Sequence, residues 1–156
     1  RERLMGEALE EAGKALALGE VPVGAVVALG DRVIARAHNL RQTRRDVSAH
    51  AEILALRAAG EALGRWQLEG CELYVTLEPC AMCAGAAQQA RLAALCFGAF
   101  DGRAGCCGSV YKLPADERLG GYVPVLGGLR AAECQALLDQ FFSERRQKDR
   151  QSRTQA

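Results

Sequence analysis

The first regular pattern along the chain has the period of an amphipathic helix, which we expect to end near Gly19. Its apolar face would consist of Leu4, Met5, Ala8, Leu9, Ala12, Ala15 and Leu16. Residues 22–29 are rich in β-forming residues, and Gly30-Asp31 turns the chain into a second such segment, 32–37. These segments predict a hairpin, and the polar, arginine-rich residues 38–47 after it predict a loop.

Helical and strand-like patterns alternate along the rest of the chain. Ser48 is the expected N-cap of the next helix, and Pro79 separates an apolar strand from the helix after it. Strands separated by helices predict an α/β fold whose mixed sheet has helices on both faces. The expected elements are a helix over 49–62, a strand over 71–77, a helix over 80–91, a strand over 93–100, a glycine-rich polar segment over 101–121, a strand over 122–126 and a helix over 131–146.

The composition is that of a globular domain. The chain has 156 residues, 49% of them hydrophobic, which is enough for one domain with its own core. We expect that domain over 1–146, followed by a polar, basic tail over 147–156. No apolar run approaches the roughly 20 residues of a membrane-spanning helix. Charged residues interrupt the first helix, so it lacks the apolar region of a signal peptide, and a cytoplasmic location is expected.

Cysteines and charges add limited information. Seven cysteines, an odd number, argue against a disulfide framework. The adjacent Cys106 and Cys107 are either reactive or metal-binding thiols, or small residues that fill space beside glycines. The net charge is +1, but basic residues cluster over 41–45 and 145–153. Such clusters can contact phosphates, and they can equally be solvated segments without a partner.

Two short motifs, each at the start of a predicted helix, contain the residues expected to do chemistry. One is the His-x-Glu sequence over 50–52, and the other is the Pro-Cys-x-x-Cys sequence over 79–83. Zinc prefers imidazole and thiolate ligands, and the first turn of a helix places cysteines three positions apart on one face. His50, Cys80 and Cys83 therefore predict three ligands to one zinc ion. The fourth position would stay open to water, as in catalytic zinc sites.

Glu52 is the expected catalytic residue, because its carboxylate can point at the zinc-bound water without being a ligand. Zinc lowers the pKa of bound water to about 7 in a favourable site, so a hydroxide nucleophile is available at neutral pH. Glu52 would take the proton from this water and deliver it to the base and to the departing amine. Each motif alone is unspecific, but the two together are typical of zinc-dependent nucleobase deaminases.

With these motifs, the chain resembles the bacterial tRNA-specific adenosine deaminases (TadA), within the zinc-dependent cytidine/deoxycytidylate deaminase superfamily. The resemblance extends over most of the chain and is strongest over 20–26, 50–53 and 73–86. It implies a cytidine-deaminase-like three-layer α/β/α sandwich with a mixed five-stranded sheet, a homodimer and one Zn²⁺ per subunit. It also implies that the wobble adenosine of a tRNA anticodon stem-loop is flipped into the pocket and converted to inosine.

The resemblance also implies a set of substrate contacts. Asn39 would contact the target nucleoside, and Asp101 would lie beside the sugar of a neighbouring nucleotide. Val23 would line the pocket, and Phe142 would pack near the flanking bases. Each has an ordinary alternative, as a core residue for Val23 and Phe142 and as a turn residue for Asn39 and Asp101. The full implied set is Val23, Asn39, Ala51, Pro79, Asp101 and Phe142.

The chain departs from the family pattern in the segment that should meet the substrate. Asp46-Val47-Ser48 replaces the common Asp-Pro-Thr, Phe100 replaces a residue that is often basic, and residues 110–122 lack a frequent Asn-His pair. The zinc chemistry is unaffected, but a deaminase of free bases or nucleosides, of guanine or cytosine type, stays open as an alternative. A non-catalytic zinc-binding subunit or RNA-binding module is disfavoured, because such relatives would be expected to lose the carboxylate of Glu52.

Overall fold

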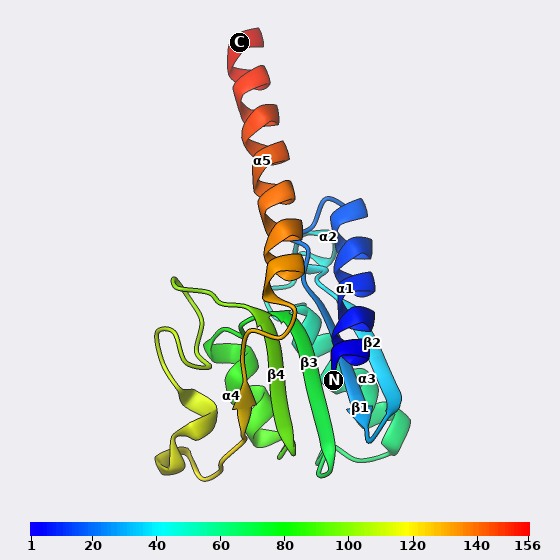
Figure 1. Cartoon of the computed structure of the whole chain (residues 1–156). Coiled ribbons are helices and arrows are strands. Elements are labelled where there is room, and N and C mark those ends of the chain that lie inside the picture. The colour runs from blue at the N-terminus through cyan, green and yellow to red at the C-terminus, as the bar shows by residue number, and fades with distance from the viewer.

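In the computed structural model of residues 1–156, a five-stranded sheet lies between two layers of helices (Figure 1). The strands lie in the order β2-β1-β3-β4-β5. In chain order, the elements are α1 (Glu2–Ala17), β1 (Gly24–Leu29), β2 (Arg32–His38), α2 (Arg41–Arg44), α3 (Ala51–Leu63), β3 (Cys71–Leu77), α4 (Ala81–Gln89), β4 (Ala94–Ala99), the 3₁₀ turns η1 (Leu113–Ala115) and η2 (Glu117–Leu119), β5 (Val125–Leu126) and α5 (Ala131–Gln155).

The sheet is mixed, as predicted. β1 pairs antiparallel with β2 and β3, whereas β3 pairs parallel with β4, and β4 with β5. Because β3 and β4 are parallel neighbours, their carboxyl ends meet at the same end of the sheet. α4 follows β3 there, and a loop over 100–112 follows β4. Sites in α/β folds gather at such strand ends.

Two apolar clusters join the helices to the sheet. One face packs against α3 and α4 through a cluster that includes Ala55, Ala87 and Phe97. The other face packs against α1 and α5 through a cluster that includes Met5 and Leu138. In Figure 1, α1 and α5 lie on the near side of the sheet and α3 and α4 on the far side. The predicted three-layer α/β/α sandwich with a five-stranded sheet is confirmed.

Two predicted features at the start of α3 are wrong. The segment over 38–47 is not entirely a loop, since Arg41–Arg44 form the short helix α2. His50, rather than Ser48, is the N-cap residue of α3. The backbone N–H and the hydroxyl of Ser48 instead donate to Asp46 Oδ1, at 2.8 and 2.7 Å. This local turn competes with capping for the same side chain.

The last helix is longer than predicted. α5 continues to Gln155 instead of ending at Arg146, so it includes most of the segment expected as a tail. From Glu144 onwards every residue is exposed, and Figure 1 shows this part of α5 extending away from the sheet. Its many Arg, Gln and Lys residues are good helix formers, which accounts for the extension. No helix in the structure, α5 included, combines the length and apolarity that a bilayer span needs.

Candidate metal centre and pocket

The starts of α3 and α4 bring the predicted metal ligands together. His50 and Cys80 are the N-cap residues of these helices, and neither side chain makes a capping hydrogen bond. Both side chains are therefore free to turn toward a common point. Cys83 lies one turn into α4 and is fully buried. The two helix starts thus place one imidazole and two thiols side by side.

The three side chains fit a tetrahedral zinc site. His50 Nδ1 lies 3.7 Å from Cys80 Sγ and 3.5 Å from Cys83 Sγ. All three candidate ligand atoms lie within 4.8 Å of one another. Zinc bonds of about 2.3 Å to sulfur and about 2.0 Å to nitrogen, at tetrahedral angles, separate the two ligand atoms by about 3.5 Å. The donor set therefore suits zinc, with Nδ1 as the histidine ligand atom.

The two thiols differ in the direction in which their pKa values are shifted. Hydrogen bonds from Cys83 and then from His50 lower the pKa of Cys80 to about 4, against the effect of burial. The pKa of Cys83 is raised, first by its bond to Cys80 and then by burial. The bond to Cys80 also raises the pKa of His50. Because the thiolate is the metal-binding form, Cys80 is ready to bind and Cys83 releases a proton when it binds.

Glu52 lies beside the three candidate metal ligands. It is only 4% exposed, and its Oε2 accepts a hydrogen bond from Cys83 Sγ at 3.1 Å. Burial raises the pKa of Glu52 above its ordinary value, although the bond from Cys83 acts in the opposite direction. A carboxyl group with a raised pKa next to a metal site is suited to take up a proton and release it again.

A pocket of about 210 Å³ opens beside these groups. Its walls come from the segment before β1, the starts of α2 and α3, the end of β3 and the loop after β4. The lining comprises Val21, Val23, Asn39, Arg41, His50, Ala51, Glu52, Leu77, Glu78, Cys80, Asp101 and Ala104. Four implied substrate contacts are among them, namely Val23, Asn39, Ala51 and Asp101. Their contacts with a substrate stay predictions.

Two implied contacts do not line this pocket. Pro79 lies between β3 and α4, where its carbonyl accepts a hydrogen bond from Cys106 N at 2.8 Å. Phe142 lies on α5, is 44% exposed and packs edge-to-face on Phe141, with ring centroids 5.2 Å apart. Any contact of Phe142 with a substrate would therefore be made outside the pocket.

Asn39 and Asp101 also act as turn residues, which was the alternative interpretation of both. Asn39 Nδ2 donates to Val21 O at 3.2 Å, and its Oδ1 accepts Arg41 N at 3.1 Å. Asp101 Oδ1 accepts the backbone N–H groups two and three positions later, at 2.9 and 3.1 Å. Asp101 is thereby held at the pocket by its own turn, and Asn39 by its own turn and by the Val21 carbonyl.

Several lining residues are not evident from the sequence, and Glu78 is the most informative of them. It directly precedes the Pro-Cys motif, where the sequence indicates only the end of a strand. It is almost fully buried and accepts hydrogen bonds from the loop after β4. Those partners are distant in sequence, so no local pattern shows them. The other lining residues that were not predicted are Val21, Arg41, Leu77 and Ala104.

Cys106 and Cys107 are both buried in the core cluster between the sheet and α4. Burial raises the pKa of both thiols, that of Cys107 to about 12. Neither belongs to the group of side chains arranged to hold a metal. Their surroundings favour the interpretation as small space-filling residues.

Known proteins resemble this chain over most of its length. The family profile of MafB19-like deaminases matches residues 1–116. A tRNA-specific adenosine deaminase of Bacillus subtilis (strain 168) is 48% identical over 152 residues, covering 97% of this chain and 94% of the relative. A protein of the same name from Haemophilus influenzae is 44% identical over 147 residues, covering 94% of this chain and 85% of the relative.

Two solved structures resemble the chain to different degrees. A chain from work on A-to-I editing by tRNA:A34 deaminases at the wobble position of transfer RNA has a TM-score of 0.85 and 43% identity, covering 88% of this chain and 100% of that one. A guanine deaminase from Nitrosomonas europaea has a TM-score of 0.76 and 30% identity, covering 90% of this chain and 83% of that one. The tRNA:A34 deaminase chain is therefore more similar to this chain than the guanine deaminase is, in both TM-score and sequence identity. The chain belongs to the tRNA-specific adenosine deaminase family.

Proposed function

We propose that this chain hydrolyses adenosine to inosine at the wobble position of a tRNA anticodon, as a zinc-dependent deaminase. The observation that carries the proposal is the triangle of His50, Cys80 and Cys83, with Glu52 alongside and a pocket in front. Relatives named for this activity match nearly the full length of the chain. The reaction type is inferred from the triangle of side chains, and the substrate is inferred from the relatives.

The proton transfers fall to Glu52. Zinc, when bound by the three ligands, lowers the pKa of a coordinated water and so supplies a nucleophile near neutral pH. Glu52 would accept the proton of the nucleophilic water, because its buried carboxylate lies next to Cys83, one of the three residues that would hold the metal. It then protonates the ring nitrogen beside the attacked carbon and assists the amino group to leave. Water is consumed and ammonia is released, so the adenine becomes a hypoxanthine.

The pocket walls would orient the base. The side-chain amide of Asn39 is fixed by its bonds to the Val21 carbonyl and the Arg41 N–H, so its remaining donor and acceptor point in a set direction. Val23 is buried and offers an apolar surface for the flat face of the ring. A base held in this orientation has already lost the freedom that the reaction would otherwise have to restrict, and this lowers the activation barrier.

The surroundings of the pocket suit RNA better than a free base. Arg41 lies in the lining, and Arg44 and Arg45 beside it are exposed. The projecting part of α5 adds exposed basic residues, Arg145, Arg146, Lys148, Arg150 and Arg153. Basic side chains neutralise phosphates, and the bases of a single-stranded loop can be splayed out for chemistry.

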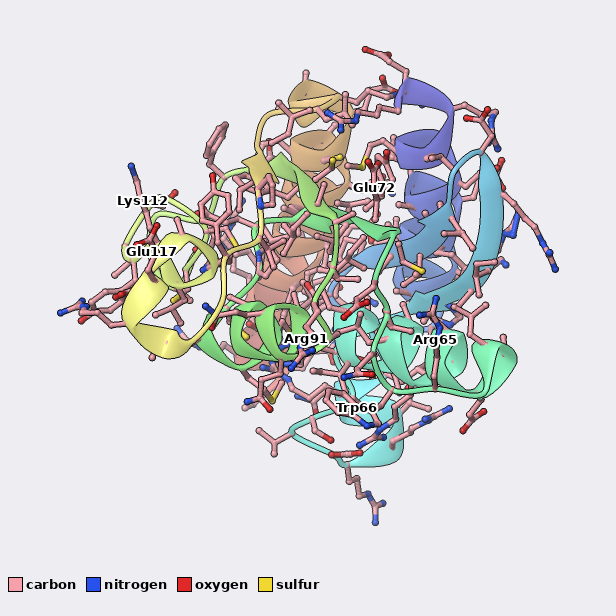
Figure 2. All side chains as sticks on the ribbon, turned by 90° about the horizontal axis from the view of Figure 1, so that it is seen from below. Arg65, Trp66, Glu72, Arg91, Lys112 and Glu117 are labelled. Atoms are coloured by element: carbon pink, nitrogen blue, oxygen red, sulfur yellow. The ribbon has the colours of Figure 1, made fainter.

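We also propose that two copies pair through the α3–α4 side. A cleft of about 700 Å³ there is lined by Ile53, Leu56 and Trp66, and Trp66 is 68% exposed. Figure 2 shows Trp66 with Arg65 and Arg91 on this side of the molecule. Exposed aromatic and arginine side chains around an apolar cleft are typical of interfaces. Light scattering should give the mass of two chains, and the mass of one chain would contradict the pairing.

A substrate comparison tests the proposed activity. Zinc-loaded protein is incubated with an anticodon stem-loop that has adenosine at the wobble position, and separately with adenosine, guanine and cytosine. Mass spectrometry should detect inosine in the stem-loop, with little reaction of the free compounds. A stem-loop with guanosine at the same position is the matched control. Rapid turnover of guanine or cytosine, with no action on the stem-loop, would favour the free-base alternative.

A further inference from the structure

Glu78 is a buried carboxylate that the proposed reaction does not use. It lies at the turn between β3 and α4, and only 2% of the residue is exposed. None of the ion pairs in the structure includes it. Burying a carboxylate without partners costs free energy. The hydrogen bonds that Glu78 accepts must therefore offset the free energy of its burial.

All of these donors come from one loop, 101–109, which follows β4. Glu78 Oε2 accepts the N–H of Asp101 at 2.9 Å and the hydroxyl of Ser109 at 2.6 Å. Its Oε1 accepts the N–H of Ser109 at 2.9 Å and that of Cys107 at 3.3 Å. Both oxygens are occupied, so Glu78 is not free to carry a proton to or from a substrate. It acts as the internal acceptor around which the loop closes.

The fit around Gly105 is an independent sign of this closure. A Cβ atom on Gly105 would lie 2.2 Å from Glu78 Oε2 and 2.4 Å from Asp101 O, which no real side chain tolerates. Gly105 does not have a positive φ, so the contact, rather than the backbone conformation, requires glycine there. Gly102 in the same loop has nothing within 4 Å of the corresponding position.

The loop that Glu78 holds is also a wall of the pocket. Asp101 and Ala104 line it, together with the candidate metal ligands His50 and Cys80. A second link joins the same two segments, because Cys106 N donates to Pro79 O at 2.8 Å. Glu78 therefore lies where the turn with the metal ligands and the loop that borders the substrate must be held in a fixed relation.

We propose that Glu78 is a positioning residue, which fixes the 101–109 loop against the metal-binding turn and thereby sets the affinity for the RNA substrate. The inference rests on the proposed function for the identity of that substrate. The carboxylate is needed because all four partners donate. A neutral amide would present an NH₂ group to at least one N–H or O–H donor and would lose the charge-assisted bonds.

Glu78→Gln is the first test, because it preserves the shape of the side chain. We expect KM for the wobble-adenosine stem-loop to rise about tenfold, with kcat changed by less than about twofold, since the reacting groups stay in place. Zinc content should stay at about one ion per chain. Hydrogen–deuterium exchange of the 101–109 amides should be about tenfold faster. A purely structural role would lower stability without this division between KM and kcat.

Gly105→Ala tests the same contact from the opposite side, and Gly102→Ala is its matched control. Gly105→Ala should reproduce the higher KM and the faster exchange, whereas Gly102→Ala should behave as wild type, because its Cβ meets nothing. Ser109→Ala removes only one hydroxyl donor at an exposed residue, so it should fold and show a smaller rise in KM.

Wild-type KM and wild-type exchange in the folded variants among Glu78→Gln, Gly105→Ala and Ser109→Ala would overturn the inference. Loss of zinc from Glu78→Gln with unchanged exchange in the loop would also overturn it, because Glu78 would then act on the metal site. If the wild-type protein deaminates no stem-loop, the proposed function fails instead. The exchange measurement separates the two cases, because it needs no substrate.

Discussion

At the scale of single residues, the site combines side chains whose spacing is local. The His-x-Glu and Cys-x-x-Cys sequences each fit within one turn at a helix start, so the grouping of these side chains could be predicted from sequence. Glu78 could not be predicted, because its hydrogen-bond donors lie 23 to 31 positions further along the chain. Asn39 and Asp101 were found only through the family resemblance, since their own turns already explain their presence.

Replacing Glu52 tests the division of labour between metal binding and proton transfer. Glu52→Gln should lower kcat about 10²–10⁴-fold, because the shuttle is lost, while about one zinc per chain is retained. Single-turnover assays on the stem-loop and metal analysis measure the two effects. Glu10→Gln, at an exposed position on α1, is the control and should change neither. Unimpaired turnover in Glu52→Gln would remove Glu52 from the mechanism.

At the scale of elements, the helices and strands were predictable, and their ends less so. α1, β1, β2, β3 and α4 lie within about two residues of the ranges predicted from apolar patterns, β-forming segments and the break at Pro79. The predicted N-cap of α3, Ser48, was wrong because Ser48 bonds to Asp46 instead of to the start of the helix. The sequence alone does not show which of these two interactions forms. The extension of α5 was missed because the apolar pattern stops, whereas the helix-forming residues continue.

The packing of α1 on β1 predicts opposite effects for two glycine substitutions. A Cβ on Gly24 would lie 2.0 Å from Ala8 O and 2.4 Å from Ala12 N, both backbone atoms that cannot move aside. Gly24→Ala should therefore lower the free energy of unfolding by about 3 kcal/mol. Gly13→Ala, within α1 and with nothing near its Cβ, should raise it by about 0.5–1 kcal/mol. Urea denaturation measures both, and equal stabilities would contradict this packing.

The contact between α1 and β2 should depend on pH through Glu11. Burial raises the pKa of Glu11, but hydrogen bonds from Lys14 and His38 outweigh it, so the pKa lies below its ordinary value of 4.5. A carboxyl group whose pKa is lower in the folded state stabilises the fold at pH values above its ordinary pKa. This contribution disappears as the pH falls through the folded-state pKa.

Glu11→Gln should therefore lower the Tm at neutral pH, and the difference from wild type should shrink as the pH falls below the ordinary carboxyl pKa of 4.5. Thermal denaturation of both proteins between about pH 7 and pH 3 measures this difference. A difference that stayed constant over the whole range would show that the charge of Glu11 contributes nothing.

At the scale of the whole molecule, the fold class followed from the alternation of helices and strands, but the strand order did not. The position of β1 between β2 and β3 is set by contacts between distant segments, which a single sequence does not display. The same holds for the direction of α5, whose basic part extends away from the sheet (Figure 1). This geometry makes α5 a candidate contact for phosphates outside the pocket.

Removing the charge of α5 tests this role in RNA binding. Replacement of Arg145, Arg146, Lys148 and Arg150 by alanine should weaken stem-loop binding and reduce the salt dependence of log K by about 0.7 for each phosphate that is no longer neutralised. Replacement of Gln147 and Gln151 by alanine on the same helix removes no charge and is the control. Binding titrations over a range of salt concentrations provide the slopes. Unchanged slopes in the charge-removal variant would place the phosphates elsewhere.

Zinc-edge X-ray absorption of the purified protein shows whether His50, Cys80 and Cys83 hold a zinc ion. We expect about one zinc per chain, with two sulfurs at about 2.3 Å and nitrogen and oxygen neighbours at about 2.0–2.1 Å, and His50→Ala should lose the metal. Four sulfur neighbours would mean that two further cysteines bind the zinc and that no position is left for water. That result, or protein without zinc, would contradict a catalytic centre built from His50, Cys80 and Cys83.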